Sequence, residues 1–284
     1  MVLVGAAVAV VTGIAYNAGA ALQKREAVQV ETGAKNLLGT LAKRKAWVAA
    51  TALSTVAWIG QVVALALAPV ALVVPLLSIG SAVLVVAGVR WLHERFHASE
   101  LAGVALVVIG AATAGASESG SSVSRAGVPF AWQFAVAGIA IVSAAIVLRW
   151  RTGSSYGAAA GLGFAAVAIY SKELGDRLAD HGLRALPRLL ASPTPWLLLA
   201  ISIGALSLLQ AGFQRANAAS VMAALTVPEA IGPLIAGFAL YHEPYPHGAR
   251  AFVLPLGLAC AIAGSAMLAL HGRRFGEPTE PATA

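Results

Sequence analysis

The chain has 284 residues, of which 59% are hydrophobic and only 11% are charged. This composition excludes an ordinary soluble domain, because about a quarter of the residues in such domains are charged. The net charge of +7 does not indicate a nucleic-acid partner, since the basic residues stand in short connections between apolar runs, where they set membrane orientation. We therefore expect an integral membrane protein whose surroundings are the lipid bilayer.

Nine apolar runs are long enough, or nearly so, to cross about 30 Å of hydrocarbon as helices. The first run has no positive residues before it, so we interpret it as a span rather than a cleaved signal peptide. Gly and Ala are frequent in the runs, which favours closely packed helices. The predicted helices cover residues 2–23, 46–68, 70–92, 99–116, 128–148, 153–171, 195–214, 217–241 and 249–270.

The distribution of Lys and Arg predicts the orientation. With the N-terminus outside, 13 of the 19 Lys and Arg residues fall on the cytoplasmic side, so the C-terminus is also expected there. The absence of an organellar signal in the sequence leads us to expect the plasma membrane. Lys24 and Lys172 are expected to extend toward the membrane interface. Tryptophans near the span ends are expected in an aromatic belt at the same depth, namely Trp47, Trp132, Trp150 and Trp196.

An internal repeat organises the chain, because residues of the first four predicted helices recur in the last four at an offset of about 149 residues. A single helix between the copies would invert the second copy relative to the first. We therefore predict an all-α integral membrane fold of nine transmembrane helices, an inverted repeat of four, one and four. The predicted parts are 1–116 (first repeat), 117–152 (connector with the fifth helix), 153–274 (second repeat) and 275–284 (disordered tail). The matches include Gly13 with Gly161, Lys24 with Lys172, Gln61 with Gln210, Leu76 with Leu225, and Gly103 and Gly110 with Gly257 and Gly264.

The eighth run holds one charged residue, Glu229, near its centre. An ionised carboxylate in hydrocarbon is costly, so Glu229 should face a cavity, a partner or a proton. Pro228 and Pro233 lack backbone donors, and with Gly232 they predict a break that leaves carbonyl groups free beside the carboxylate. A charge next to a broken helix at the midplane is typical of a transporter binding site. The alternative is a protonated Glu229 that only holds a neighbouring helix.

The first repeat has Gly80 at the position of Glu229, with two serines beside it and a proline before them. We predict that a solute path runs between these two helices. Buried amides near span ends either line this path or join helices through hydrogen bonds, and Gln61 and Gln210 are favoured as a symmetric pair. The residues expected on the path are Glu229, Gln210, Gln61, Ser78, Ser81 and Asn17, and the expected helix breaks are Pro75, Pro228, Gly232 and Pro233.

Residues 93–97 read H-E-x-x-H, a pattern that holds zinc on a helix and raises a membrane metalloprotease as an alternative function. The repeat argues against it. His242-Glu243 stands at the matching place, where Pro244 prevents the helical spacing, and no third ligand is evident. We interpret Glu94 and Glu243 as carboxylates at repeat ends that pair with basic groups or cap helices. No enzyme activity and no cofactor are expected.

Residues 66–115 resemble the drug/metabolite transporter superfamily, including its EamA-like branch, in which a helix ending in Glu is followed by a G-x6-G helix. Glu94 and Glu243 precede such glycine pairs here. The NIPA-type magnesium transporter branch is similar in its AP-x2-LV-x-PL pattern, which matches residues 68–76, and in helix ends carrying lysine, which match residues 17–24 and 171–172. This resemblance implies nine spans and magnesium as substrate. The Pro228-Glu229 pair departs from the branch pattern.

The leading hypothesis is a transporter that moves a small solute, magnesium or another divalent cation, by alternating access, with Glu229 exposed to each side in turn. A single carboxylate equally suits a proton-coupled exporter of a small metabolite or organic cation. A membrane scaffold without transport is a third hypothesis. The sequence has no phosphate-binding loop for direct ATP drive. A homodimer is left open.

Overall fold

A computed structural model of the protein describes residues 2–31, 36–67, 86–87, 90, 98–117, 130–239 and 247–272. Throughout these ranges the chain forms helices and the turns that join them, with no strand. The all-α prediction is confirmed for this part of the chain. The predictions at Pro75, Ser78, Gly80, Ser81, Glu94 and Glu243, and those on the H-E-x-x-H motif, fall outside the described residues.

Eight of the nine predicted helices coincide with helices of the structure, and the other, 70–92, falls mostly outside the described residues. The order along the chain is α1 (Val2–Ala27), α2 (Leu37–Leu41), α3 (Lys45–Leu67), α6 (Ala98–Ser117), α7 (Phe130–Leu148), α8 (Gly153–His181), the 3-10 helix η1 (Gly182–Ala185), α9 (Leu186–Ala191), α10 (Thr194–Phe213), α11 (Ala218–Ala239) and α12 (Arg250–Gly272).

The segment 172–194, predicted as a connection, is mostly helical instead. Helix α8 continues to His181, and η1 and α9 follow it. The segment contains the helix formers Leu, Ala, Glu and Arg, and Arg177 Nε donates to Glu173 Oε1 one turn earlier at 2.7 Å. The hydrophobic pattern ended the predicted helix at 171, because the residues beyond it are polar, but helix propensity and this i,i+4 pair continue the helix.

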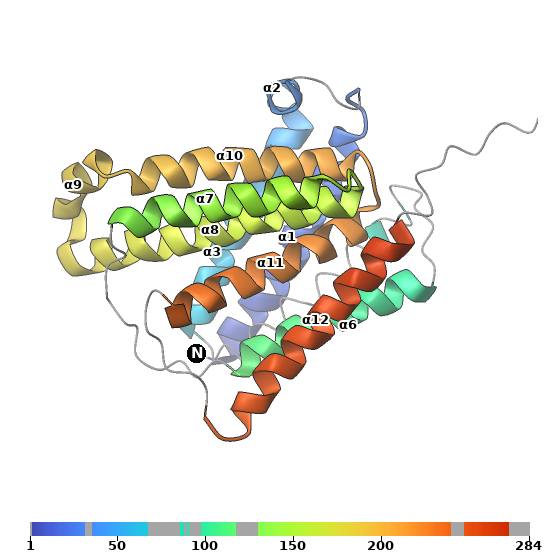
Figure 1. Ribbon diagram of the computed structural model, residues 1–284. Coiled ribbons are helices and arrows are strands. Elements are labelled where there is room, and N and C mark those ends of the chain that lie inside the picture. Colours follow the sequence, from blue (N-terminus) through green and yellow to red (C-terminus); the bar gives the residue numbers. More distant parts are fainter. Residues whose placement is uncertain are drawn as a thin grey trace, which may run out of the picture.

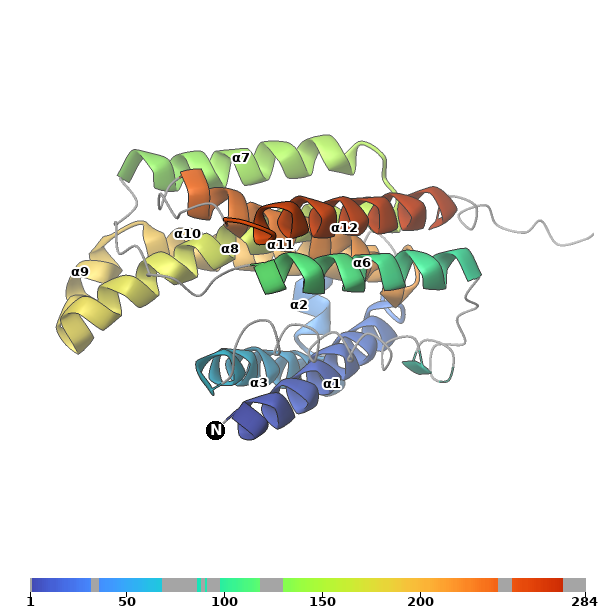
Figure 2. The same cartoon turned by 90° about the horizontal axis from the view of Figure 1, so that it is seen from below.

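The helices form a layered bundle (Figures 1 and 2). In Figure 2, α7 lies at one side and α1 with α3 at the other, and α8, α10, α11 and α12 lie between them. Helix α11 is central, since it contacts α1, α6, α8, α10 and α12. Figure 1 shows α11 beside α8, running in the same direction. Much of α11 therefore lies within the bundle, although Ile235 on the same helix is exposed.

Equivalent helix pairs of the two predicted repeats pack alike. The first and second helices of each copy, α1 with α3 and α8 with α10, are extensively packed and antiparallel (Figure 1). The fourth helices, α6 and α12, pack antiparallel against each other at their glycines. A Cβ added at Gly110 would lie 2.5 Å from the carbonyl oxygen of Gly257, and one at Gly264 would lie 2.6 Å from that of Gly103. The contact is therefore reciprocal between the G-x6-G motifs.

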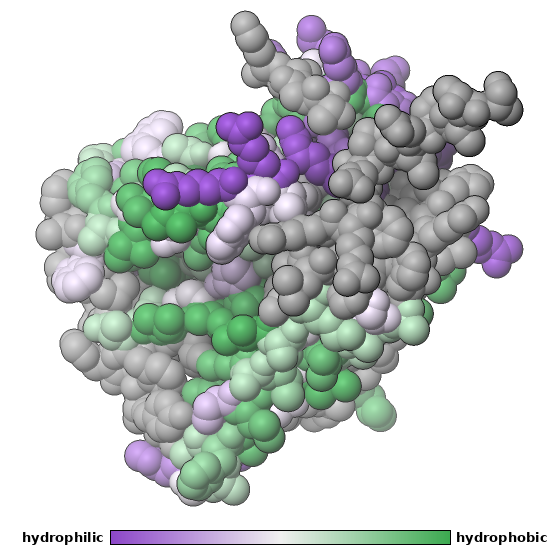
Figure 3. All heavy atoms as spheres, turned by 45° about the vertical axis from the view of Figure 1, so that its right-hand side comes forward, coloured by the Kyte–Doolittle hydropathy of each residue, from purple (hydrophilic) through white to green (hydrophobic). Residues whose placement is uncertain are grey.

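Large apolar side chains are common on the surface of the described structure. Among them are Ile139, Ile141 and Leu256, each more than 60% exposed. The interior is mainly hydrophobic but also includes Gln23, Lys24, Glu26, Gln133, Glu173, Thr194, Gln210 and Ser220. In Figure 3 hydrophobic residues cover much of the coloured surface and hydrophilic residues gather at the upper edge. An apolar surface of this extent marks a contact with lipid or with other proteins.

By length and composition, two of the described helices are able to cross a membrane. They are Leu3–Ala27 within α1 and Thr194–Phe213, which is α10. Shorter apolar stretches occupy Leu101–Gly110, Trp132–Leu148 and Arg250–Gly264. The nine-span arrangement is thus still a prediction.

Candidate functional site

Glu229 lies half-buried on α11, near the middle of the bundle. The predicted helix break at Pro228, Gly232 and Pro233 is wrong, because α11 is one continuous helix from Ala218 to Ala239. Proline keeps a helical φ and removes only one hydrogen bond, and the neighbouring helices hold α11 on its path. Gly232 fits against α8, where an added Cβ would lie 2.5 Å from the Cβ of Ala165.

The prolines still leave carbonyl groups without their helical donors. In an α-helix each N–H bonds to the carbonyl four residues earlier, so Pro228 deprives Ala224 of its donor and Pro233 deprives Glu229. The prolines therefore remove one hydrogen bond of the helical ladder on each side of Glu229.

Tyr16 of α1 is a first-repeat residue within electrostatic range of this carboxylate. The Tyr16 hydroxyl and Glu229 are close enough to interact electrostatically. Tyr16 also packs against the central cluster, which contains Ala160, Val221 and Leu225. The site is therefore built where α1, α8 and α11 meet. The sequence contained a signal for it, because Thr12, Tyr16 and Gln23 recur at helical spacing and make one polar stripe along α1.

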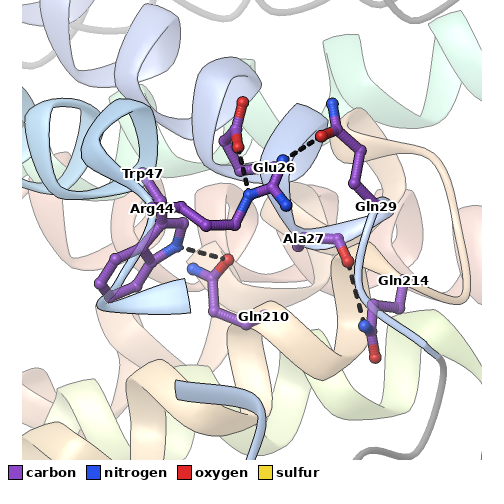
Figure 4. Close-up of polar contacts among 7 residues, drawn as sticks. All are labelled: Glu26, Ala27, Gln29, Arg44, Trp47, Gln210 and Gln214. Carbon is purple, nitrogen blue, oxygen red and sulfur yellow. Dashed lines mark hydrogen bonds and ion pairs between the residues drawn. The ribbon is translucent and has the colours of Figure 1, made fainter. Parts of the chain in front are cut away.

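A second polar group joins α1, α3 and α10, about two helical turns along α1 from Tyr16. Gln210 Nε2 donates to Gln23 Oε1 at 2.8 Å. Trp47 Nε1 donates to Gln210 Oε1 at 3.2 Å (Figure 4). Gln23 Nε2 donates in turn to Ser54 Oγ at 3.2 Å. Gln210 is fully buried, so these bonds replace the water that its amide would otherwise bind.

Lys24 belongs to the same region and does not extend to the membrane interface. It is only 6% exposed, and its Nζ donates to the carbonyl oxygen of Ala216 at 2.5 Å. The prediction that Lys24 extends toward the membrane interface is therefore wrong. The turn between α10 and α11 brings a backbone acceptor to its ammonium group. Trp47 is likewise buried rather than part of an aromatic belt, whereas Trp132, Trp150 and Trp196 are about half exposed or more.

Two further side chains, Gln214 and Arg44, make hydrogen bonds around this region, and Figure 4 shows both residues. Gln214 Nε2 donates to the carbonyl oxygens of Ala27 and Val30, each at 3.0 Å. Arg44 Nε donates to Glu26 Oε2 at 2.5 Å, and its guanidinium also bonds Gln29. Arg44 is therefore an internal clamp of the first repeat, between the end of α1 and the start of α3. Gln214 instead joins α10 to the end of α1.

A third polar group occupies the opposite end of α8 and α10. Tyr170 Oη donates to the carbonyl oxygen of Gln133 at 2.6 Å, and Thr194 Oγ1 donates to Gln133 Oε1 at 3.0 Å. All three residues are buried. These bonds link α7, α8 and α10, so they lie within the connector helix and the second repeat.

The predicted path residues are not brought together as a set. Gln61 is half-buried on α3, 14 residues from Trp47, which bonds Gln210. The two amides of the predicted symmetric pair therefore lie about 20 Å apart along the helix axis. Asn17 Nδ2 donates to Gly13 O at 2.9 Å, within its own helix. Gln210 joins helices through hydrogen bonds, which is one of the two roles predicted for the buried amides. Glu229 interacts electrostatically with Tyr16.

Comparisons of the chain with protein-family models, with curated proteins and with solved structures found no match. The resemblance to the drug/metabolite transporter superfamily therefore rests on the residues quoted above and is still a prediction.

Proposed function

We propose that this protein is a multi-pass membrane transporter that moves a small solute by alternating access, with Glu229 as its charge-bearing site. One observation carries the proposal. Glu229 stands as a charged residue on the central helix α11, between two prolines, and its carboxylate interacts electrostatically with Tyr16 of the other repeat. A carboxylate held inside an apolar bundle costs several kcal/mol unless it has a function or a partner, roughly 2.5 kcal/mol at the least.

The packing of the helices supports two inverted copies in a nine-span bundle. The fourth helices, α6 and α12, run antiparallel and meet through reciprocal contacts of their glycine motifs. This is the relation that a two-fold axis in the membrane plane produces between equivalent helices. The first and second helices of each copy also pair alike. A transporter of this construction binds its solute where the copies meet, and Glu229 and Tyr16 lie on opposite sides of that boundary.

The donor groups favour a divalent cation. Glu229 supplies a carboxylate, and the Tyr16 hydroxyl lies within electrostatic range of it. Oxygen ligands of this kind suit magnesium, which keeps several of its waters and needs only one or two carboxylates. The alternative is a proton-coupled exporter of a small metabolite or organic cation, in which Glu229 carries the proton. The presence of a single carboxylate, Glu229, among the described residues of the site favours the exporter.

Flux measurement tests the proposal. The protein is reconstituted in vesicles containing a magnesium-sensitive dye and a pH-sensitive dye, and the wild type is compared with Glu229→Gln. The matched control is Glu31→Gln, which removes an exposed carboxylate beyond the end of α1. Magnesium entry that Glu229→Gln abolishes and Glu31→Gln preserves is the expected result. Solute-dependent proton movement lost only in Glu229→Gln would select the exporter instead. Flux unaffected by Glu229→Gln would refute the role of this residue.

A further inference from the structure

The polar contacts around Gln210 cross from one repeat to the other at a single end of the bundle. Five hydrogen bonds among the described residues join the end of α1 and the start of α3 to the end of α10 and the turn after it. Their side chains are Lys24 and Trp47 in the first repeat and Gln210 and Gln214 in the second, with Gln23 accepting from Gln210. This end also carries the basic residues Arg25, Arg44, Arg149, Arg151 and Arg215, which predict the cytoplasmic side.

We infer that these residues form a latch that closes the cytoplasmic end between the two repeats and opens during the transport cycle. The inference rests on the proposed function, since it assigns a gating role to the polar group that lies about two helical turns along α1 from Tyr16. The first-repeat side of the latch is joined within its own repeat. Arg44 clamps the end of α1 to the start of α3 through Glu26 and Gln29. The latch consists of the hydrogen bonds that cross from the first repeat to the second.

The chemistry of the latch suits reversible opening. Its members are neutral amides, an indole and one ammonium group bonded to a backbone carbonyl. Each of these groups bonds water as readily as it bonds its present partner, so separation at the wet cytoplasmic face exchanges hydrogen bonds instead of stranding a charge pair. Gln214 Oε1 is buried and has no hydrogen-bond partner in the described structure. The closed arrangement is therefore incompletely satisfied, which favours opening.

Accessibility of a cysteine behind the latch tests the inference. Ala20 is 4% exposed and lies on α1 one turn before Gln23, so Ala20→Cys in a Cys260→Ser chain reports opening toward the cytoplasm. The chain is studied in membrane vesicles with an impermeant maleimide applied to each face separately. The latch variant is Gln210→Leu. The matched control is Gln133→Leu, which removes an equally buried amide that bonds only within the connector and second repeat.

Gln210→Leu is expected to raise the labelling rate from the cytoplasmic face about 25-fold, because it removes two buried hydrogen bonds that each shift an equilibrium about fivefold. Gln133→Leu should leave the rate unchanged. Equal rates in Gln210→Leu and wild type, or an equal increase in both variants, would overturn the inference. Labelling requires no solute, so its result is independent of the flux assay. If the latch opens in a protein that shows no magnesium or proton flux, that result counts against the proposed function alone.

A second measurement covers the case in which Gln210→Leu does not fold. Spin labels are placed at Lys43 in the first repeat and at Trp150, three residues before the second repeat begins at residue 153. Both positions are exposed at this end, so the labels report the separation of the first repeat from the start of the second. With Gln214→Leu as the latch variant, the distance distribution should gain a longer component that the wild type lacks. An unchanged distribution in a folded Gln214→Leu protein would overturn the inference.

Discussion

The antiparallel contact of α6 with α12 is expected to fail when one methyl group is added at Gly110. In Gly110→Ala the new Cβ would lie 2.5 Å from the carbonyl oxygen of Gly257. The obstructing atom is backbone, so relief requires that the whole of α12 move outward. Overpacking of this kind costs about 1–3 kcal/mol. The matched variant Gly138→Ala adds the same methyl on α7, where nothing lies within 4 Å of the new Cβ, and replacing helical Gly by Ala there gains up to about 1 kcal/mol.

The assay measures the thermal unfolding midpoint of each purified variant in detergent. Samples are heated to a series of temperatures, and the fraction of protein that remains monodisperse is measured at each one. Because 1 kcal/mol shifts the midpoint of a protein of this size by about 2–4 °C, Gly110→Ala should unfold roughly 2–12 °C below wild type, and Gly138→Ala at or slightly above it. The contact is reciprocal, so Gly264→Ala, which meets Gly103 O at 2.6 Å, should lose a similar amount. Equal midpoints for Gly110→Ala and Gly138→Ala would refute the close crossing.

Three further outcomes follow from individual contacts. Tyr16→Phe removes the hydroxyl that interacts with Glu229, and flux should fall about tenfold with no loss of thermal stability; retained flux would contradict this. Tyr170→Phe removes a buried 2.6 Å hydrogen bond to Gln133 O, so the free energy of unfolding should drop by about 1 kcal/mol while flux per folded molecule stays unchanged. Arg44→Ala removes a partly exposed ion pair with Glu26, so it should lower the free energy of unfolding by less than about 1 kcal/mol, and 1 M salt should reduce the difference.

Hydrophobic runs located the helices well, because these helices are apolar along most of their length. Eight predicted ranges match helices to within a few residues at most ends. The largest error is α8, which extends ten residues beyond its predicted end. There the helix is maintained by helix propensity and by the pair Glu173–Arg177, neither of which contributes to a hydrophobic run.

The sequence predicted the charged residue of the candidate site but not the residue that interacts with it. Glu229 could be identified from its isolation in an apolar run, whereas Tyr16 required knowledge of how α1 crosses α11. The prolines were overinterpreted, because their effect on a helix depends on the neighbours that hold it, and α11 continues through them. Lys24 shows the same dependence. Its burial results from the carbonyl of Ala216, which lies 192 residues away in the chain, and no local pattern records that contact.

The central claim is that the solute path reaches Glu229 from both faces of the membrane in turn. Thr226 lies one turn before Glu229 on α11 and is half-buried, so Thr226→Cys in a Cys260→Ser chain keeps the carboxylate and reports on its surroundings. Labelling with an impermeant cationic thiol reagent is measured from each face of oriented vesicles, with the exposed Ile203→Cys on α10 as the lipid-facing control. We expect Thr226→Cys to react from both faces, with protection by magnesium, and Ile203→Cys to react from neither. Reaction of Thr226→Cys from one face only, or from neither, would contradict alternating access at Glu229.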